Sequence, residues 1–320
     1  MTLFKTILCA ADFSESSREA FRVACSLARE GETKILVLHV LEAVHIAQEP
    51  VPSGQETLPF SRGEGNQGYH ESVKERLRQT YVSDRPIETE YLISDGPTTH
   101  MILRAAEEEG CDLIAMGTHG RTGLSRVLAG SVAEAVLREA RCPVLVLRSP
   151  EPGKSLARDV HAILHPSDFS NHSQTAAGIA RTLAGNLGAR LVLLHVAPME
   201  EVVPGEVGMP MDPEESHVSL EALRKQLEGP DLKSPIEVVH SEGDVASEIL
   251  RTAETKGCDL LVLGTHGRTG LLRLLMGSLA EAVLRRSKCP VLMVKPRIPI
   301  TESTPESESF RGLKLAGDGA

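Results

Sequence analysis

Two glycine-rich segments of the chain have the composition of a phosphate-binding loop. Gly117–Gly123 reads Gly-Thr-His-Gly-Arg-Thr-Gly and is followed by Gly130–Ser131. The pattern recurs in Gly264–Gly270, which is followed by Gly277–Ser278. Glycines let a phosphate approach the backbone without a Cβ in the way, and the free N–H groups of a helix start carry partial positive charge. The spacing therefore predicts a phosphate site in each segment, with an ordinary glycine-rich turn and serine N-cap as the alternative.

Other phosphate-binding motifs are absent from the sequence. The Walker pattern G-x-x-x-x-G-K-[ST] does not occur, and no G-x-G-x-x-G follows the first apolar run of either half. Phosphoryl transfer also needs a positioned nucleophile and a base or metal-holding acid, and no such group repeats beside the glycines. The sequence supports neither a P-loop NTPase nor a dinucleotide dehydrogenase, and it predicts no catalytic residue and no protein metal ligand.

Several nearby side chains have two interpretations. His119 and His266 lie inside the glycine segments, and we interpret them as solvated rather than catalytic because no carboxylate is close in sequence. His39 and His195 close an apolar run in each half, and we expect them to be buried and hydrogen-bonded rather than ligands. A role in phosphate binding is left open for four arginines in or after the glycine segments: Arg121, Arg126, Arg268 and Arg273.

Composition and charge exclude several classes of function. The 320 residues suffice for two domains, and 44 acidic against 34 basic side chains leave a net charge of -10. This charge repels nucleic acid and anionic membranes alike, and no apolar run approaches the roughly 20 residues of a membrane-spanning helix. The six cysteines include no Cys-x-x-Cys pair, and we expect Cys142 and Cys289 to be packed, reduced thiols. The sequence therefore predicts a cytoplasmic protein without a nucleic-acid or membrane partner.

The chain contains two copies of one domain. Gly110–Leu147 and Gly257–Val294 align without a gap and are identical at 26 of 38 positions. The period is that of a whole domain rather than of a solenoid repeat, so the sequence predicts a tandem duplication. The predicted parts are a first domain over 1–148, a linker over 149–158, a second domain over 159–297 and a disordered acidic tail over 298–320.

Each copy alternates apolar runs with amphipathic stretches. Apolar strands that are joined by helices predict a parallel, doubly wound α/β sheet with right-handed crossovers, whose ligands bind beyond the carboxyl ends of the strands. The two last strands are apolar edges, so we expect them to pair in an internal pseudo-dimer, and further homodimerisation is left open. The first copy predicts strands near 6–11, 34–40, 87–93, 112–116 and 143–147, and helices near 15–29, up to 82, 98–109 and from 131.

The pattern resembles the universal stress protein family in its tandem two-domain form. The resemblance lies in G-x2-G-x9-G-[ST] after the fourth strand, in the Asp that closes the first strand and in a Cys-Pro-Val final strand. It covers nearly all of residues 1–297 and is typical of the ATP-binding branch of the family. It implies two tandem Rossmann-like sheets, each of five parallel strands in the order 3-2-1-4-5.

The resemblance also implies one ATP site in each domain, with Mg²⁺ or Mn²⁺ held by the phosphates. Adenine is expected near the aspartate, with the ribose and phosphates along the glycines. The residues implied in the first domain are Ala11, Asp12, Val40, Met116, Gly117, Gly120, Gly130, Ser131 and Val132. Those implied in the second domain are Ser167, Asp168, Val196, Leu263, Gly264, Gly267, Gly277, Ser278 and Leu279.

The predicted function is that of an ATP-binding stress-response protein that is non-enzymatic or only weakly hydrolytic. Asp12 and Asp168 can accept a hydrogen bond from the exocyclic amine of adenine, where guanine carries an oxygen, so we expect ATP to be preferred to GTP. Ala11 in one copy stands where the other has Ser167, which allows the two adenine pockets to differ in affinity. Two alternatives stay open: a scaffold or interaction module whose glycine segment is structural, and a slow ATP hydrolase.

Overall fold

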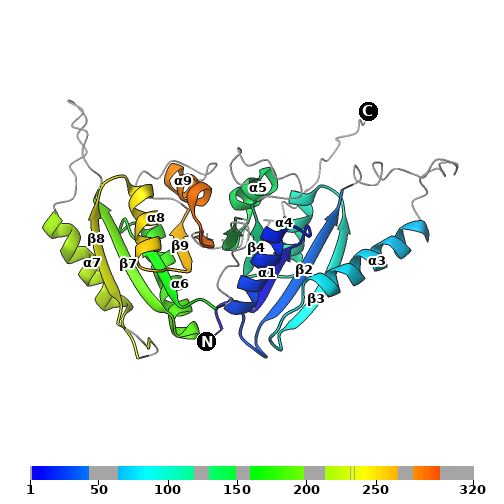
Figure 1. Ribbon diagram of the computed structural model, residues 1–320, viewed down its shortest axis with the longest axis horizontal. Coiled ribbons are helices and arrows are strands. Elements are labelled where there is room, and N and C mark those ends of the chain that lie inside the picture. The colour runs from blue at the N-terminus through cyan, green and yellow to red at the C-terminus, as the bar shows by residue number, and fades with distance from the viewer. Residues whose placement is uncertain are drawn as a thin grey trace, which may run out of the picture.

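The first half of the chain alternates strands and helices (Figure 1). The structure is a computed structural model that describes residues 2–42, 64–118, 130–148, 159–197, 213–230, 232–233, 235–265 and 277–295. The elements of the first half are β1 (Thr6–Ala10), α1 (Glu15–Leu27), β2 (Lys34–Leu41), α3 (Glu64–Thr80), β3 (Glu88–Asp95), α4 (Thr98–Glu108), β4 (Leu113–Gly117), α5 (Ser131–Glu139) and β5 (Val144–Leu147).

The second half repeats this order of elements. They are β6 (Ala162–Pro166), α6 (Asn171–Leu187), β7 (Arg190–Ala197), α7 (Pro213–Leu227), β8 (Glu237–Glu242), α8 (Val245–Thr255), β9 (Leu260–Gly264), α9 (Ser278–Arg286) and β10 (Val291–Val294). The predicted strands and helices of the first copy are therefore confirmed. Most of the predicted ends differ from the observed ends by one or two residues.

The strands of the described residues form one ten-stranded sheet in the order β3-β2-β1-β4-β5-β10-β9-β6-β7-β8. Each half keeps the predicted order 3-2-1-4-5, and its strands run parallel. The halves meet at β5 and β10, which pair antiparallel with Leu145 opposite Leu292. The sequence predicted two five-stranded sheets, and this pair of strands makes them one continuous sheet.

Helices cover both faces of the sheet, and a hydrophobic core fills each side. One core includes residues of α1, α3, α6 and α7, and the other includes residues of α4, α5, α8 and α9. Each core contains side chains from both halves because the sheet runs through the whole molecule. Strands that are covered on both faces need apolar side chains at successive positions, as in Ile7 and Leu8, which are both fully buried.

The fold leaves the carboxyl ends of β1, β2 and β4 at one edge of the sheet, and α5 begins at the end of the glycine segment that follows β4. The second half places β6, β7, β9 and α9 in the same way. Among the described helices, none combines the length and the apolar character that crossing a membrane requires.

Candidate functional site

The predicted site residues of the first half lie at the carboxyl edge of the sheet, around the end of β1. Asp12 follows β1, Val40 lies near the end of β2, and Gly117 ends β4. The backbone N–H of Ala11 donates to the carbonyl of Leu38 at 2.8 Å, which holds the ends of β1 and β2 together. β1 lies between β2 and β4, so the winding of the chain reverses here, where doubly wound sheets bind ligands.

The second half brings the equivalent residues to the equivalent edge. Asp168 follows β6, Val196 lies near the end of β7, and Gly264 ends β9. The backbone N–H of Ser167 donates to the carbonyl of Leu194 at 2.7 Å, which matches the contact in the first half. The second half thus repeats the placement of these three residues in the first half.

Each aspartate also closes a tight turn that starts a helix. Asp12 Oδ1 accepts hydrogen bonds from the backbone N–H of Ser14 at 2.9 Å and from its hydroxyl at 2.6 Å. Asp168 Oδ1 accepts the same two bonds from Ser170 at 3.0 and 2.7 Å. The intervening Phe13 has a φ of 65°, which non-glycine residues rarely adopt. One carboxylate oxygen is therefore engaged in the backbone turn, a role that the sequence did not reveal.

The serines of these turns are the N-caps of the first helix in each half. Ser14 Oγ accepts a hydrogen bond from the backbone N–H of Ser17 at 3.2 Å, and Ser170 Oγ accepts one from Ser173 at 3.2 Å. Serine is among the preferred N-cap residues because its oxygen satisfies one of the unpaired N–H groups of the first turn. The turn and the cap together fix the direction in which each aspartate leaves the sheet.

One histidine on the second strand of each half is hydrogen-bonded to the residue that follows the first strand. His39 Nδ1 lies 2.6 Å from the carbonyl oxygen of Ala11, and His195 Nδ1 lies 2.8 Å from that of Ser167. Because a carbonyl only accepts, Nδ1 carries the proton in both rings. The ring of His39 also packs on Phe13, with 4.9 Å between the centroids. The prediction that these histidines are hydrogen-bonded is confirmed, and His195 is buried while His39 is half-buried.

The glycine at the end of the fourth strand is required by the neighbouring helix. A Cβ added to Gly117 would lie 2.7 Å from the Cβ of Ser16 in α1, so any side chain would collide with that helix. At Gly264 an added Cβ would lie 3.3 Å from the carbonyl carbon of His172 in α6, a less severe contact. The packing of α1 and α6 against the sheet thus explains these two glycines without reference to a ligand.

The glycine before the last helix of each half is hydrogen-bonded to the residue that follows the fourth strand of that half. Gly130 N–H donates to the carbonyl of Thr118 at 2.6 Å, and Gly277 N–H donates to that of Thr265 at 3.4 Å. Both glycines have negative φ, -41° and -57°, and as N-cap residues they offer no side chain to cap the start of α5 or α9. Ser131 is exposed at the first position of α5. The first-turn N–H groups therefore receive no hydrogen bond from the side chain of the N-cap residue, the arrangement that binds anions at helix starts.

Some predicted residues contribute little side-chain surface or fall outside the described residues. Met116 and Leu263 are buried in the core, so their side chains do not face this edge, whereas Leu279 is exposed. Val132 is partly buried against the core. The predicted residues Gly120 and Gly267, and the histidines and arginines of the two glycine segments, lie outside the described residues.

The two halves differ most beneath the aspartate turn. In the first half the hydroxyl of Tyr81 accepts a hydrogen bond from the backbone N–H of Phe13 at 3.0 Å and lies 2.7 Å from Ser17 Oγ. Burial raises the pKa of Tyr81 to about 12, so the phenol stays protonated. In the second half Ser167 Oγ accepts the N–H of Phe169 instead, at 3.2 Å.

A buried histidine completes the polar cluster of the second half. His165 Nδ1 lies 2.9 Å from the carbonyl oxygen of Val262, and its Nε2 lies 3.3 Å from Ser173 Oγ. Burial lowers the pKa of His165 to about 4, so the imidazole is neutral at physiological pH. The equivalent residue of the first copy is Cys9. The sequence allowed the two pockets to differ, through Ala11 and Ser167, and did not point to this histidine.

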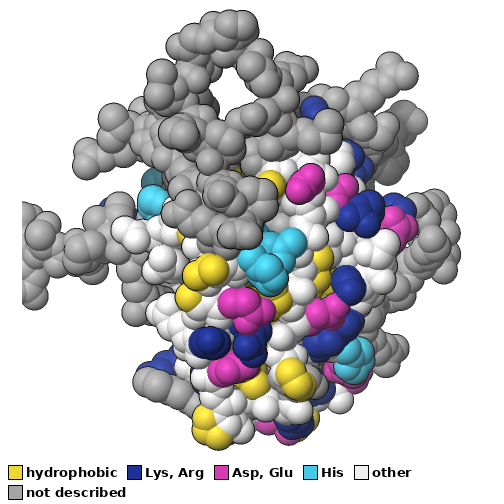
Figure 2. Space-filling view, turned by 90° about the vertical axis from the view of Figure 1, so that its left-hand side faces the viewer, with side chains coloured by type: hydrophobic (Ala, Val, Ile, Leu, Met, Phe, Trp, Pro, Cys, Tyr) yellow, Lys and Arg dark blue, Asp and Glu magenta, His cyan; other side chains and the backbone are white. Residues whose placement is uncertain are grey.

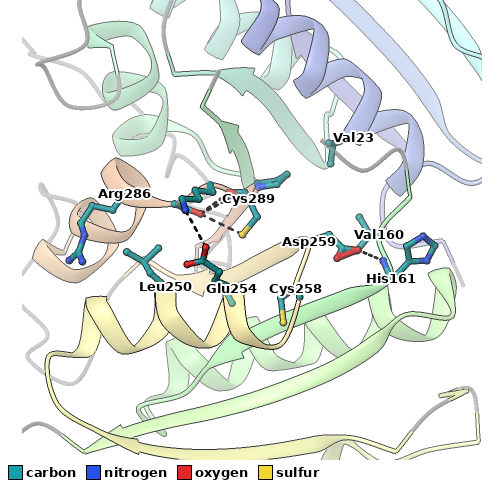
Figure 3. Close-up of a pocket in the computed structure, with 14 residues that line it drawn as sticks. Val23, Val160, His161, Leu250, Glu254, Cys258, Asp259, Arg286 and Cys289 are labelled. Atoms are coloured by element: carbon teal, nitrogen blue, oxygen red, sulfur yellow. Dashed lines mark hydrogen bonds and ion pairs between the residues drawn. The ribbon is translucent and has the colours of Figure 1, made fainter. Parts of the chain in front are cut away.

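A cavity of about 590 Å³ lies away from the predicted nucleotide residues (Figure 3). It is lined by residues of α8, by the segments that lead into β9 and β10 and, across from them, by Val23 of α1. Asp259 in its wall accepts a hydrogen bond from the backbone N–H of His161 at 2.6 Å. Burial raises the pKa of Cys258 to about 12 and that of Cys289 to about 11, so both thiols are protonated packing groups. The cavity includes none of the predicted site residues.

A family model matches the chain once in each half. The model of the universal stress protein family covers residues 3–148 and 160–295. The chain belongs to the universal stress protein family. This universal stress protein has the tandem form that its internal repeat predicted.

Individual relatives match one half or both. A universal stress protein of Methanocaldococcus jannaschii is 35% identical over 149 residues, which cover 47% of this chain and 85% of that protein. One of Mycobacterium tuberculosis is 29% identical over 290 residues, which cover 88% of this chain and 95% of that protein. A solved universal stress protein structure from Archaeoglobus fulgidus has a TM-score of 0.60 at 21% identity, covering 91% of this chain and 98% of that one. The likeness to that structure concerns the fold.

Proposed function

We propose that this universal stress protein binds one ATP molecule in each half and acts in a stress response. The observation that carries the proposal is a pair of features found in both halves at the same sheet edge. An aspartate follows the first strand, and the last helix starts at a glycine without a capping side chain. A carboxylate that can accept from an adenine amine and free N–H groups that can bind phosphate suit an adenine nucleotide.

The residues that would hold the nucleotide are those that the sequence predicted. Asp12 and Asp168 are assigned to the adenine, and the starts of α5 and α9 at Ser131 and Ser278 to the phosphates. In this proposal the phosphates hold Mg²⁺ or Mn²⁺. Over the described ranges, no group of three or more His, Cys, Asp or Glu side chains could hold a metal ion.

We further propose that the chain works as an internal pseudo-dimer in the cytoplasm. The antiparallel pairing of β5 with β10 supports the pseudo-dimer, because it pairs two apolar edge strands that would otherwise be open to other chains. The six cysteines are free, which supports a reducing compartment. Whether two such chains associate further is a question for sedimentation analysis.

Calorimetric titration of the full chain tests the nucleotide proposal. With ATP and MgCl₂ we expect two bound molecules per chain and weaker binding of GTP. Absence of heat and of any ATP-dependent rise in melting temperature would contradict the proposal. A phosphate-release assay on the same sample distinguishes simple binding from slow hydrolysis.

A scaffold that binds no nucleotide is the second candidate. It is favoured by the packing of α1 against Gly117, since a glycine that the fold itself requires needs no ligand to explain it. The two candidates differ at Gly277, where the described residues leave room for a Cβ, so a variant at that position separates them.

A further inference from the structure

Two histidine rings are in contact at the outer end of the second half. His217 lies on α7 and His240 on β8, and their ring centroids are 4.3 Å apart at an interplanar angle of 68°. Both side chains are exposed. Figure 2, which faces this end of the molecule, shows histidine side chains gathered near the middle of the face with acidic and basic side chains around them. This pair is remote from the cavity of Figure 3, whose lining contains neither residue.

The spacing of the rings is close to that of two imidazoles on one metal ion. A zinc–nitrogen bond of about 2.0 Å and a tetrahedral angle place the centroids of two ligating imidazoles roughly 5 Å apart. The observed 4.3 Å is within about 1 Å of that spacing. Exposed side chains on two neighbouring elements can make this adjustment by rotating about their own bonds.

Burial, followed by the nearby His217 and His195, lowers the pKa of His240. A neutral ring is the form that binds a metal ion, because the ligating nitrogen must be unprotonated. Glu221, one turn after His217 on α7, acts in the opposite direction and raises the pKa of His240, while its Oε2 accepts a hydrogen bond from Arg224 Nε at 2.7 Å. The carboxylate adds negative potential near the two rings.

His195 fixes the position of His240 from the other side. The two residues pair across the parallel strands β7 and β8, and Nδ1 of His195 is bonded to the carbonyl of Ser167. His195 is therefore held in place by the sheet edge and does not compete for the contact with His217. The strand pairing keeps His240 on a rigid element, which is how ligand geometry is maintained in binding sites.

The first half lacks this pair, although it has the same fold. His39, the equivalent of His195, pairs with Ile93 across β2 and β3, so an isoleucine stands where the second half has His240. The helix histidine of the first half, His70, is 3.1 Å from the carboxylate of Asp95 instead. The paired imidazoles are thus specific to the second copy and are not explained by the duplication.

We propose that His217 and His240 form a binding site for a divalent transition-metal ion of the imidazole-preferring class, such as Zn²⁺, Cu²⁺ or Ni²⁺. The two rings supply two ligands, and water completes the coordination shell. Imidazole nitrogen suits these ions, whereas Mg²⁺ prefers oxygen ligands, so the site is distinct from the phosphate-held ion of the proposed nucleotide sites.

Calorimetric titration of the full chain with ZnCl₂ at pH 7.5, without nucleotide, tests this site. His217→Gln and His240→Ile, the latter introducing the residue of the first half, should each weaken zinc binding by about tenfold or more, a loss of about 1.4 kcal/mol. The double variant should bind more weakly than either single variant, because each single variant keeps one imidazole ligand. His70→Gln removes the histidine of the equivalent helix and serves as the matched control with unchanged affinity.

Lowering the pH to 5.5 should weaken zinc binding to the unaltered chain, because protons then compete for the rings. His240→Gln provides a second, polar replacement if the isoleucine variant has an altered circular dichroism spectrum or melting temperature. Zinc affinity that is the same in the unaltered chain and in both folded single variants would overturn the proposal. Two zinc ions per unaltered chain, of which each single variant loses one, would also overturn it, since each ring would then hold its own ion.

Discussion

Lys295 of the second half caps a helix of the first half, because its Nζ donates a hydrogen bond to the carbonyl of Arg138 at 2.9 Å. The same ammonium donates to the carbonyl of Ala140 at 2.6 Å. In the opposite direction, the guanidinium of Arg148 donates to the carbonyl of Arg285 at the end of α9. Arg148 and Lys295 occupy equivalent positions in the two copies, so each half caps the last helix of the other. This exchange lies beside the β5–β10 pair and fixes the halves relative to each other.

Replacing Lys295 with methionine should destabilise the join between the halves. The change keeps much of the side-chain volume and removes two charge-assisted hydrogen bonds, which leaves the last carbonyls of α5 without these donors. Because the group is partly exposed, we expect a loss of about 2 kcal/mol in the free energy of unfolding. Urea denaturation measures it, with Lys225→Met on the exposed surface of α7 as the control. Equal midpoints for the two variants would argue against a stabilising cap.

Acid should destabilise the second half through His165. Burial lowers the pKa of this histidine from 6.5 to about 4, so below pH 6.5 the unfolded chain binds a proton that the folded chain does not. The free energy of unfolding therefore falls as the pH decreases, by about 2 kcal/mol between pH 7 and pH 5. His165→Cys installs the residue of the first copy and should lose less stability over this range in urea denaturation.

His161→Gln is the control for the acid experiment. It removes an exposed histidine close in sequence to His165 and should leave the pH dependence of the free energy of unfolding unchanged. If His165→Cys shows the same loss between pH 7 and pH 5 as the unaltered chain, the acid sensitivity comes from other groups.

The two glycines before the last helices should respond differently to a side chain. An added Cβ would lie 2.8 Å from the carbonyl oxygen of Thr118 at Gly130, and 3.5 Å from that of Thr265 at Gly277. Gly277→Val should thus keep a near-native melting temperature and reduce the ATP stoichiometry from two to one, because the branched side chain blocks the start of α9. Gly130→Val should lower the melting temperature as well as remove a site.

The sequence did not predict this contrast. It identified both glycines as phosphate-binding candidates and treated them alike, because identical local sequences give no measure of the space around them. Calorimetric titration with ATP, together with a circular dichroism spectrum of the same variant, distinguishes the two candidate functions. Two ATP molecules bound to a folded Gly277→Val variant would favour the scaffold candidate.

Much of the fold follows from local patterns in the sequence. The strands around Ile7 and Leu145 are aliphatic runs, and the helices between them have apolar residues at helical spacing, so the alternation of strands and helices and the parallel pairing could be predicted. The strand order 3-2-1-4-5 was implied by the family resemblance. The internal repeat then extended each assignment to the second half. The chain's membership of the universal stress protein family was likewise predicted, from the glycine and aspartate positions.

The remaining features depend on contacts between distant residues. The positive φ of Phe13 arises from the turn that Asp12 closes, and nothing in the phenylalanine itself indicates it. His217 and His240 are brought together by the packing of α7 on β8, and Lys295 reaches Arg138 only because two edge strands pair. Such pairs cannot be read from periodicity, since periodicity describes one element at a time.

Asparagine at both aspartate turns should change the preference for the nucleotide base. In Asp12→Asn with Asp168→Asn, the amide oxygen can still accept from Ser14 and Ser170, so the turns are retained. The second carboxylate oxygen becomes an NH₂ donor, which matches the oxygen of guanine and opposes the amine of adenine. We expect the ratio of ATP to GTP affinity, measured by calorimetry, to fall by about tenfold or more. The double alanine variant is the control, because it removes the turns and should weaken both nucleotides together. An unchanged ratio in the asparagine variant, with its melting temperature retained, would remove these carboxylates from the adenine site.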